Sequence, residues 1–246
     1  MYNGDNMKIL VLGDGLLGTE IIKQIGWDFV SRKRDGIDFN KLESYERYLH
    51  YYDTIFNCVA YTKTYDNNKN LHVQTNFKSV IDLVEYCNQT NKKIVHVSTD
   101  YIFSNSVENA SEEDVPANCN NWYTYSKLLG DAYVQFMAKD YLLIRCEFKP
   151  RPYPYPKATI QIGNFDYVDT VASLIISLIK NNASGVYNVG TGRKSMLELA
   201  SQTKEVELWD KNPEETMPFD FTMNVDKMKN FLKEHNDTNI ACDSNI

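Results

Sequence analysis

The chain of 246 residues lacks the features that identify a membrane or nucleic-acid-binding protein. None of its apolar runs approaches the roughly 20 residues that cross a bilayer, so we expect no membrane partner. It has no long basic block and carries a formal net charge of -7. Because binding to phosphate backbones needs clustered positive charge, nucleic acid is not an expected partner. The opening segment "MYNGDNMKIL" also has no apolar stretch of the kind found in secretory signals.

Patterns of metal ligands and structural disulfides are missing as well. The five cysteines are odd in number, show no CxxC or Cys/His spacing, and the four histidines do not cluster. This pattern favours free thiols in a reducing compartment, and we expect a cytoplasmic protein without a metal site. Cys119 precedes Tyr123 by four residues, but it has no basic neighbour that would activate a thiol, so we expect it to be non-catalytic.

The sequence does contain a regular alternation of strand and helix patterns. Short apolar runs predict strands within residues 8–13, 27–31, 51–61, 92–98, 141–146 and 185–192. Helical spacing of apolar residues predicts helices over 16–25, 70–90, 124–139, 167–180, 195–202 and 224–235. Such alternation is typical of an α/β fold with a doubly wound parallel (Rossmann) sheet.

A proline-rich segment over 145–157 interrupts this alternation, since proline excludes regular helix and favours extended neighbours. We therefore expect a Rossmann domain over 7–150. A small C-terminal substrate-binding lobe over 151–240 would be interleaved with the end of that domain.

The first predicted strand runs directly into the glycine motif "GDGLLG". Gly13 would permit a tight turn, Gly15 would let a pyrophosphate approach the backbone, and Gly18 would let helix and strand pack closely. Leu16 and Leu17 lie between these glycines and belong to the same expected cofactor site. An ordinary glycine-rich turn has the same letters, but the strand before it and the helix after it favour dinucleotide binding.

The second predicted strand ends in cations. Ser31 is followed by Arg32, Lys33 and Arg34, and the nearest acid is Asp35. An acid at this place holds the ribose 2′-hydroxyl of NAD, whereas a cation accommodates the 2′-phosphate of NADP. The residues favour NADPH, with NADH as the alternative cofactor; a solvated basic turn would have the same composition.

Two further segments carry groups that can transfer a proton. "VSTDYIF" (97–103) closes a strand, where Ser, Thr and Asp are common in turns but where open parallel sheets also bind ligands. About 25 residues after the Ser/Thr pair, Tyr123 and Lys127 have the i, i+4 spacing that places them on one helix face. An ammonium beside a phenol would lower the tyrosine pKa towards the operating pH. A YxxxK pair is common by chance, and its position after the glycine turn and the strand-end hydroxyls is what favours catalysis.

Taken together, these segments resemble the extended short-chain dehydrogenases/reductases, and most of all the dTDP-4-dehydrorhamnose reductase group. The resemblance covers most of residues 7 to 200 and is carried by "VLGDGLLG", "FNCVAYTKTYDNN", "HVSTDYIF", "WYTYSK", "LLIR", "YVDTVA" and "GVYNVGTG". "STDYIF" is the most specific of these segments.

The resemblance implies roles for individual residues. Thr99 would polarise a keto oxygen, Tyr123 would donate the proton, and Lys127 would orient the nicotinamide ribose and lower the tyrosine pKa. The residues implied at the cofactor after the third strand are Asn57, Val59 and Ala60. Those implied at the substrate are Tyr61, Thr62, Asp100, Tyr101 and Arg145.

The implied activity is the NADPH-dependent reduction of a 4-keto-6-deoxy nucleotide sugar, of the dTDP- or UDP-4-dehydrorhamnose type, in deoxysugar biosynthesis. A nucleotide-sugar epimerase or dehydratase is one alternative, although Tyr101 stands where a related epimerase/reductase branch has a cysteine. A non-catalytic NADP-binding regulatory subunit is another, because the chain is short around 147–165, where relatives hold the nucleotide sugar. A homodimer through helices 70–90 and 124–139 is the expected assembly.

Two tyrosines of the proline-rich segment, Tyr153 and Tyr155, are expected to contribute to packing. Stacking on a nucleobase is the alternative role for them.

Overall fold

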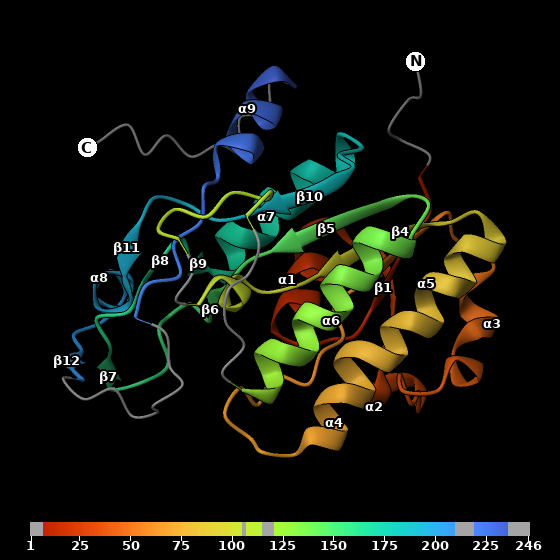
Figure 1. The fold of residues 1–246 in the computed structure, drawn as a ribbon, viewed down its shortest axis with the longest axis horizontal. Coiled ribbons are helices and arrows are strands. Elements are labelled where there is room, and N and C mark those ends of the chain that lie inside the picture. Colours follow the sequence, from red (N-terminus) through yellow and green to blue (C-terminus); the bar gives the residue numbers. More distant parts are fainter. Residues whose placement is uncertain (1–6, 105–106, 115–120, 210–218, 236–246) are drawn as a thin grey trace.

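A parallel sheet of six strands forms the centre of the molecule in the computed structural model, which describes residues 7–104, 107–114, 121–209 and 219–235 (Figure 1). The strand order is β10-β5-β4-β3-β1-β2. The strands are β1 (Ile9–Leu12), β2 (Asp28–Val30), β3 (Thr54–Asn57), β4 (Lys93–Val97), β5 (Tyr141–Arg145) and β10 (Gly185–Asn188). The predicted doubly wound α/β fold is confirmed. The chain adds strands on one side of β1 and then on the other, and the crevice at such a reversal is where open α/β sheets bind ligands.

Helices cover both faces of this sheet (Figure 1). On one face lie α4 (Lys69–Val73), α5 (Ser79–Thr90) and α6 (Trp122–Met137), and on the other lie α1 (Leu16–Ile25) and α7 (Val168–Lys180). The single helix predicted over 70–90 is α4 and α5 joined through a π-helical stretch, η3 (Gln74–Lys78). The remaining elements outside the small lobe are α2 (Arg32–Asp35), η2 (Leu42–Ser44), α3 (Glu46–Leu49), η4 (Asp100–Phe103) and α9 (Asp226–Glu234).

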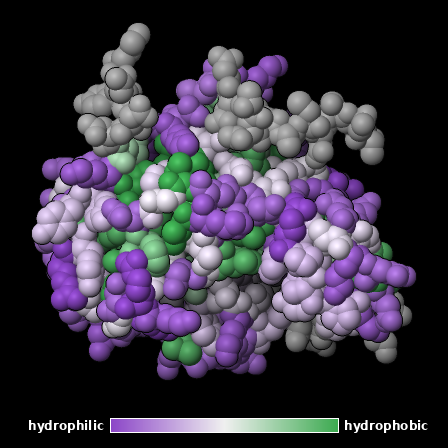
Figure 2. Space-filling model, turned by 180° about the vertical axis from the view of Figure 1, so that it is seen from behind, coloured by the Kyte–Doolittle hydropathy of each residue, from purple (hydrophilic) through white to green (hydrophobic). Residues whose placement is uncertain are grey.

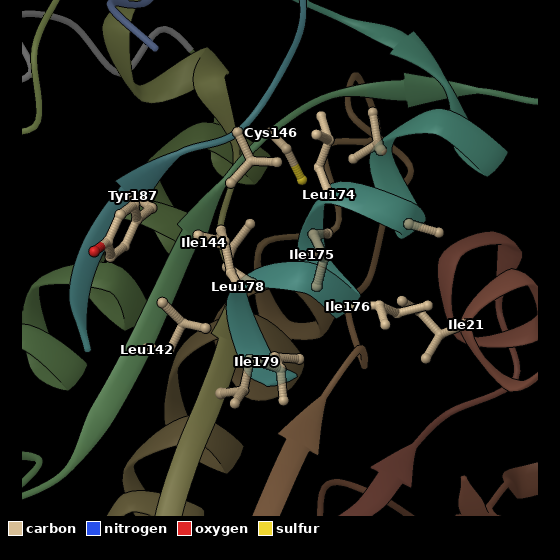
Figure 3. Close-up of a cluster of buried hydrophobic side chains, with 14 of the residues drawn as sticks. Ile21, Leu142, Ile144, Cys146, Leu174, Ile175, Ile176, Leu178, Ile179 and Tyr187 are labelled. Atoms are coloured by element: carbon tan, nitrogen blue, oxygen red, sulfur yellow. The ribbon is translucent and has the colours of Figure 1, made fainter. Parts of the chain in front are cut away.

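The apolar face of α7 forms the centre of the larger core cluster (Figure 3). Ile175 and Leu178 are completely buried, between the β5 residues Leu142 and Ile144 on one side and Ile21 of α1 on the other. Burying an aliphatic side chain of this size contributes about 1.5–3 kcal/mol, so this cluster fixes α7 on the sheet. Viewed from behind, some apolar residues are visible in the middle of the surface and hydrophilic residues surround them (Figure 2).

A small lobe lies beside the sheet and contains short strand pairs and one helix (Figure 1). The pairs are β6 (Phe148–Lys149) with β9 (Asp166–Tyr167), β7 (Lys157–Ala158) with β12 (Glu207–Leu208), and β8 (Ile162–Gly163) with β11 (Lys194–Ser195). The helix α8 (Met196–Ser201) begins with a capping box of Ser195 and Glu198. The chain enters the lobe after β5, returns to the sheet for α7 and β10, and enters the lobe again. The lobe is thus attached to the carboxyl end of the sheet by several crossings of the chain.

The helix with the predicted Tyr/Lys pair begins two residues earlier than its apolar spacing predicts. The Asn121 side chain accepts a hydrogen bond from the Thr124 amide at 2.9 Å and caps α6, which therefore starts at Trp122. Tyr123 and Lys127 consequently lie one turn apart in the same helix. Residues 1–6 of the opening segment and Cys119 lie outside the described residues.

No helix in the described ranges combines the length and apolar character that a bilayer-spanning helix requires.

Candidate active site

The carboxyl ends of β1, β3, β4 and β5 open into one cavity of about 860 Å³. The sheet side of its wall includes Gly15, which follows β1, and Thr99, which follows β4. The small lobe supplies the opposite wall, with Tyr153, Tyr155 and Trp209 among its residues. The cavity therefore lies between the sheet and the lobe, at the edge where a parallel sheet binds ligands.

The glycine turn at the end of β1 fits a dinucleotide pyrophosphate. Gly13 has φ +94°, which L side chains rarely adopt, and a Cβ at Gly18 would lie 2.1 Å from the Gly13 carbonyl oxygen. A Cβ at Gly15 would meet nothing within 4 Å, so this glycine faces open space. Gly15 is also the N-cap of α1 and offers no capping side chain. Among the described residues, no side chain caps the first amides of α1, and these amides and the helix dipole suit an anion such as a pyrophosphate. Leu16 and Leu17 also line the cavity.

In the turn after β2, the acidic side chain is engaged in hydrogen bonds, whereas two basic side chains are exposed. The Ser31 hydroxyl is buried and caps α2, accepting from the Arg34 amide at 3.1 Å. The Asp35 carboxylate accepts from the Ser31 amide at 2.7 Å and pairs with Arg34. Arg32 and Lys33 are exposed and form no ion pair with other described residues. The two free cations suit a 2′-phosphate, whereas the engaged Asp35 is poorly placed to bind a 2′-hydroxyl.

The structure brings the three predicted catalytic residues to the same cavity. Thr99, Tyr123 and Lys127 all line it, and the Thr99 hydroxyl is hydrogen-bonded to the Tyr123 phenol. The Lys127 side chain is 2% exposed, and its Nζ donates to the Val97 carbonyl oxygen at 2.5 Å. This contact holds the ammonium against the end of β4.

The electrostatics of this trio differ from the sequence-based prediction. Burial raises the pKa of Tyr123, the nearby acids Asp100 and Glu147 raise it further, and only the hydrogen bond with Thr99 lowers it. The sequence predicts that the Lys127 ammonium lowers this pKa towards the operating pH, whereas the pKa is raised. Burial disfavours the phenolate more strongly than the hydrogen bond with Thr99 favours it. Burial also acts on Lys127, whose pKa falls to about 8.

Of the residues implied at the cofactor after β3, only Ala60 lines the cavity. Asn57 is buried, and its Oδ1 accepts from the Val59 amide at 3.0 Å. A Cβ at Gly13 would lie 3.2 Å from Val59 Cγ2. Asn57 and Val59 thus do not line the cavity. Val59 packs against the glycine turn, and Asn57 holds Val59 in place.

The predicted substrate residues separate into two groups. Thr62 and Tyr101 line the cavity, and the Tyr101 and Tyr123 rings lie edge to face with centroids 6.5 Å apart. Tyr61 does not line it, because its hydroxyl donates to Asp66 and its amide donates to Asn76 Oδ1.

Asp100 and Arg145 do not reach the cavity, contrary to the prediction that they bind substrate. Asp100 is completely buried, with Thr99 Oγ1 3.4 Å from its Oδ1, and burial raises its pKa well above the ordinary value. Arg145 is buried and donates from Nε and Nη2 to the two carboxylate oxygens of Asp131, each at 3.0 Å. A bidentate pair of this kind occupies the guanidinium and gives Arg145 a structural role.

Sequence reasoning missed an ion pair in the cavity wall, formed by Glu147 and Lys149 just after β5. In an extended segment, the side chains of residues i and i+2 point to the same side, so charged residues at 147 and 149 would lie next to each other. That spacing is the signal that could have found them. The sequence also predicts mainly a packing role for Tyr155, whereas the exposed ring of this residue borders the cavity.

The fold and the cavity are those of the short-chain dehydrogenase/reductase class of oxidoreductases. Residues 7–148 match the family model described as "RmlD substrate binding domain", and the chain belongs to this family.

Known proteins similar to the chain include a polysaccharide biosynthesis protein and dTDP-4-dehydrorhamnose reductases. The spore coat polysaccharide biosynthesis protein SpsK of Bacillus subtilis is 24% identical over 223 residues, which are 80% of this chain and 78% of that protein. The dTDP-4-dehydrorhamnose reductase of Mycobacterium tuberculosis is 26% identical over 144 residues, 53% of this chain and 46% of that protein. The solved structure of dTDP-4-dehydrorhamnose reductase from Bacillus anthracis, in complex with NADP, superposes with a TM-score of 0.77 at 20% identity and covers 91% of both chains.

Proposed function

We propose that this protein reduces the keto group of a 4-keto-6-deoxy nucleotide sugar, of the dTDP- or UDP-4-dehydrorhamnose type, with NADPH as the reductant. The observation that carries the proposal is the convergence of Thr99, Tyr123 and Lys127 on the cavity that also receives the glycine turn. The names of the similar proteins support the same substrate class.

The residues that would hold the cofactor follow from the geometry of the site. The amides at the start of α1 would bind its pyrophosphate, and Arg32 and Lys33 would bind its 2′-phosphate. When bound, a reduced nicotinamide supplies a hydride to the carbonyl carbon of the sugar.

The protein supplies the proton. The Tyr123 phenol is protonated at neutral pH and donates its proton to the carbonyl oxygen as the alcohol forms. The Thr99 hydroxyl holds the phenol in place. The Lys127 ammonium would orient the nicotinamide ribose of the cofactor from the cavity wall. Binding of the remote nucleotide orients the reacting carbon.

The pH dependence of the reaction follows from Lys127. Because its pKa in the protein is about 8, the ammonium is present below that pH and is lost as the pH rises through it. We expect kcat/KM for keto-sugar reduction to be flat near pH 7 and to fall about tenfold per pH unit well above pH 8. Initial rates measured across pH 6–10 test this expectation. A Lys127→Met variant should show a low rate without this descending limb; a wild-type profile that stays level through pH 9.5 would contradict the assignment.

The proposed function is tested by the stoichiometry of cofactor consumption. Purified protein is incubated with dTDP- and UDP-linked 4-keto-6-deoxy sugars and either NADPH or NADH, and the products are separated. We expect one NADPH oxidised per sugar reduced, and a lower kcat/KM with NADH. Product formed without net oxidation of cofactor would identify an epimerase or dehydratase. Binding of NADPH without conversion of any sugar would identify the non-catalytic alternative.

A further inference from the structure

The ion pair between Glu147 and Lys149 in the cavity wall has no part in the mechanism above. Glu147 Oε1 contacts Lys149 Nζ, and the side chains are 13% and 24% exposed. Both residues line the cavity together with Tyr101 and Tyr123. A pair so far removed from water returns little net stability, because the cost of desolvating two charges offsets their attraction. Its place in the cavity wall therefore points to a role in binding.

The pair occupies a fixed place close to the reacting groups. β5 lies beside β4, with Ile144 opposite Val97, and the Ser98 amide donates to the Ile144 carbonyl oxygen at 2.6 Å. Neighbouring strands are about 4.8 Å apart, so the segment that follows β5 runs next to the segment with Thr99. Lys149 is held in β6, where it pairs with Tyr167 of β9. Glu147 is near enough to raise the pKa of Tyr123. The pair thus shares one cavity wall with Thr99 and Tyr123, the residues with the proposed catalytic hydroxyls.

The open hydrogen-bonding groups of the pair match a hydroxyl group. Glu147 Oε2 is buried and has no hydrogen-bond partner among the described residues. A buried acceptor without a donor costs free energy, which a ligand donor would recover after a small rotation of the side chain. The Lys149 ammonium has three donors, and within the described ranges it donates only to Glu147. A hydroxyl group both donates and accepts hydrogen bonds. The carboxylate can accept from it, and the ammonium can donate to it. A phosphate, in contrast, would be repelled by the carboxylate.

The chemistry of the proposed substrate identifies which hydroxyl this is. The carbons next to a C4 carbonyl are C3 and C5, and in a 6-deoxy sugar C5 carries a methyl group and C3 carries the hydroxyl. We propose that Glu147 and Lys149 bind the 3-hydroxyl of the sugar, and that the protein therefore selects 3-hydroxy over 3-deoxy sugars. This inference rests on the proposed function for the class of ligand.

The test is an equilibrium measurement that does not need turnover. Calorimetry is used to titrate the protein, saturated with NADP⁺, with a dTDP-6-deoxyhexose and with its 3,6-dideoxy counterpart. We expect the 3-hydroxy ligand to bind at least about tenfold more tightly to the wild type, since a site built for a hydroxyl rejects an analogue that lacks it. In a Glu147→Gln/Lys149→Met variant the two ligands should bind within about twofold of each other. NADP⁺ affinity should be unchanged.

Two further variants serve as a milder substitution and as a control. Glu147→Gln alone preserves the shape of the side chain and should already reduce the preference. Asp169→Asn breaks the Arg151–Asp169 ion pair, which does not line the cavity, and should leave the preference intact. Equal affinity of the wild type for the two ligands, or a preference that survives in the double variant, would overturn the inference. If no keto sugar were turned over, the reductase proposal would be refuted. The inference about the 3-hydroxyl would still be tested, because calorimetry measures the binding preference without turnover.

Discussion

Replacing Tyr123 with phenylalanine is expected to lower kcat for keto-sugar reduction about a thousandfold, while NADPH affinity stays within about twofold. The substitution removes the proposed proton donor of the trio, and it keeps the ring that packs near Tyr101. Thr99 and Lys127 remain in the cavity but cannot replace it, since the Lys127 ammonium is held on the Val97 carbonyl oxygen. Single-turnover rates and NADPH fluorescence titration measure the two quantities independently.

A matched control for this variant is Tyr125→Phe in the same helix. Tyr125 is 43% exposed and does not line the cavity, so losing its hydroxyl should leave kcat within about twofold. Full activity of the Tyr123→Phe enzyme would refute the role of Tyr123. Weakened NADPH binding in that variant would indicate that the ring positions the cofactor and not only the proton.

Replacing Asp131 with alanine is expected to lower the free energy of unfolding by about 3–5 kcal/mol. Asp131 is completely buried and accepts two hydrogen bonds from the Arg145 guanidinium, and it also accepts from the Gln135 side-chain amide at 2.6 Å. Without the carboxylate, the buried guanidinium loses the ion-pair partner that it has among the described residues. A loss of this size would unfold much of a protein whose total stability is about 5–15 kcal/mol. Urea titration followed by circular dichroism measures the change.

Two controls separate the buried charge from the loss of packing. Asp131→Leu/Arg145→Met removes both charges and should recover most of the lost stability, because no unpaired ion remains. Asp169→Ala breaks the largely exposed pair with Arg151 and should cost at most about 1 kcal/mol. A cost for Asp131→Ala no larger than that for Asp169→Ala would show that Arg145 reaches water when its partner is lost.

The order of strands and helices could be predicted because each depends on a local pattern. The apolar run before Gly13 and the helical spacing from Leu16 to Ile25 were sufficient for β1 and α1, whose bounds match the expectation within two residues. The glycine turn was equally predictable, since the left-handed φ of Gly13 and the contact at Gly18 arise within one strand–turn–helix unit. The short strands of the lobe escaped prediction because two-residue strands have no period to detect.

The sequence by itself determined which elements form and where the cofactor turn lies, because hydrogen bonding and side-chain periodicity act over a few residues. It also placed Tyr123 and Lys127 one helical turn apart. Only the tertiary structure decided which polar groups face the cavity. It turned Arg145 inward to Asp131, buried Asp100, and placed Glu147 in the same cavity wall as Thr99 and Tyr123. The pKa values of Tyr123 and Lys127 depend on burial by segments distant in the chain, so desolvation, a property of the assembled interior, determined their direction.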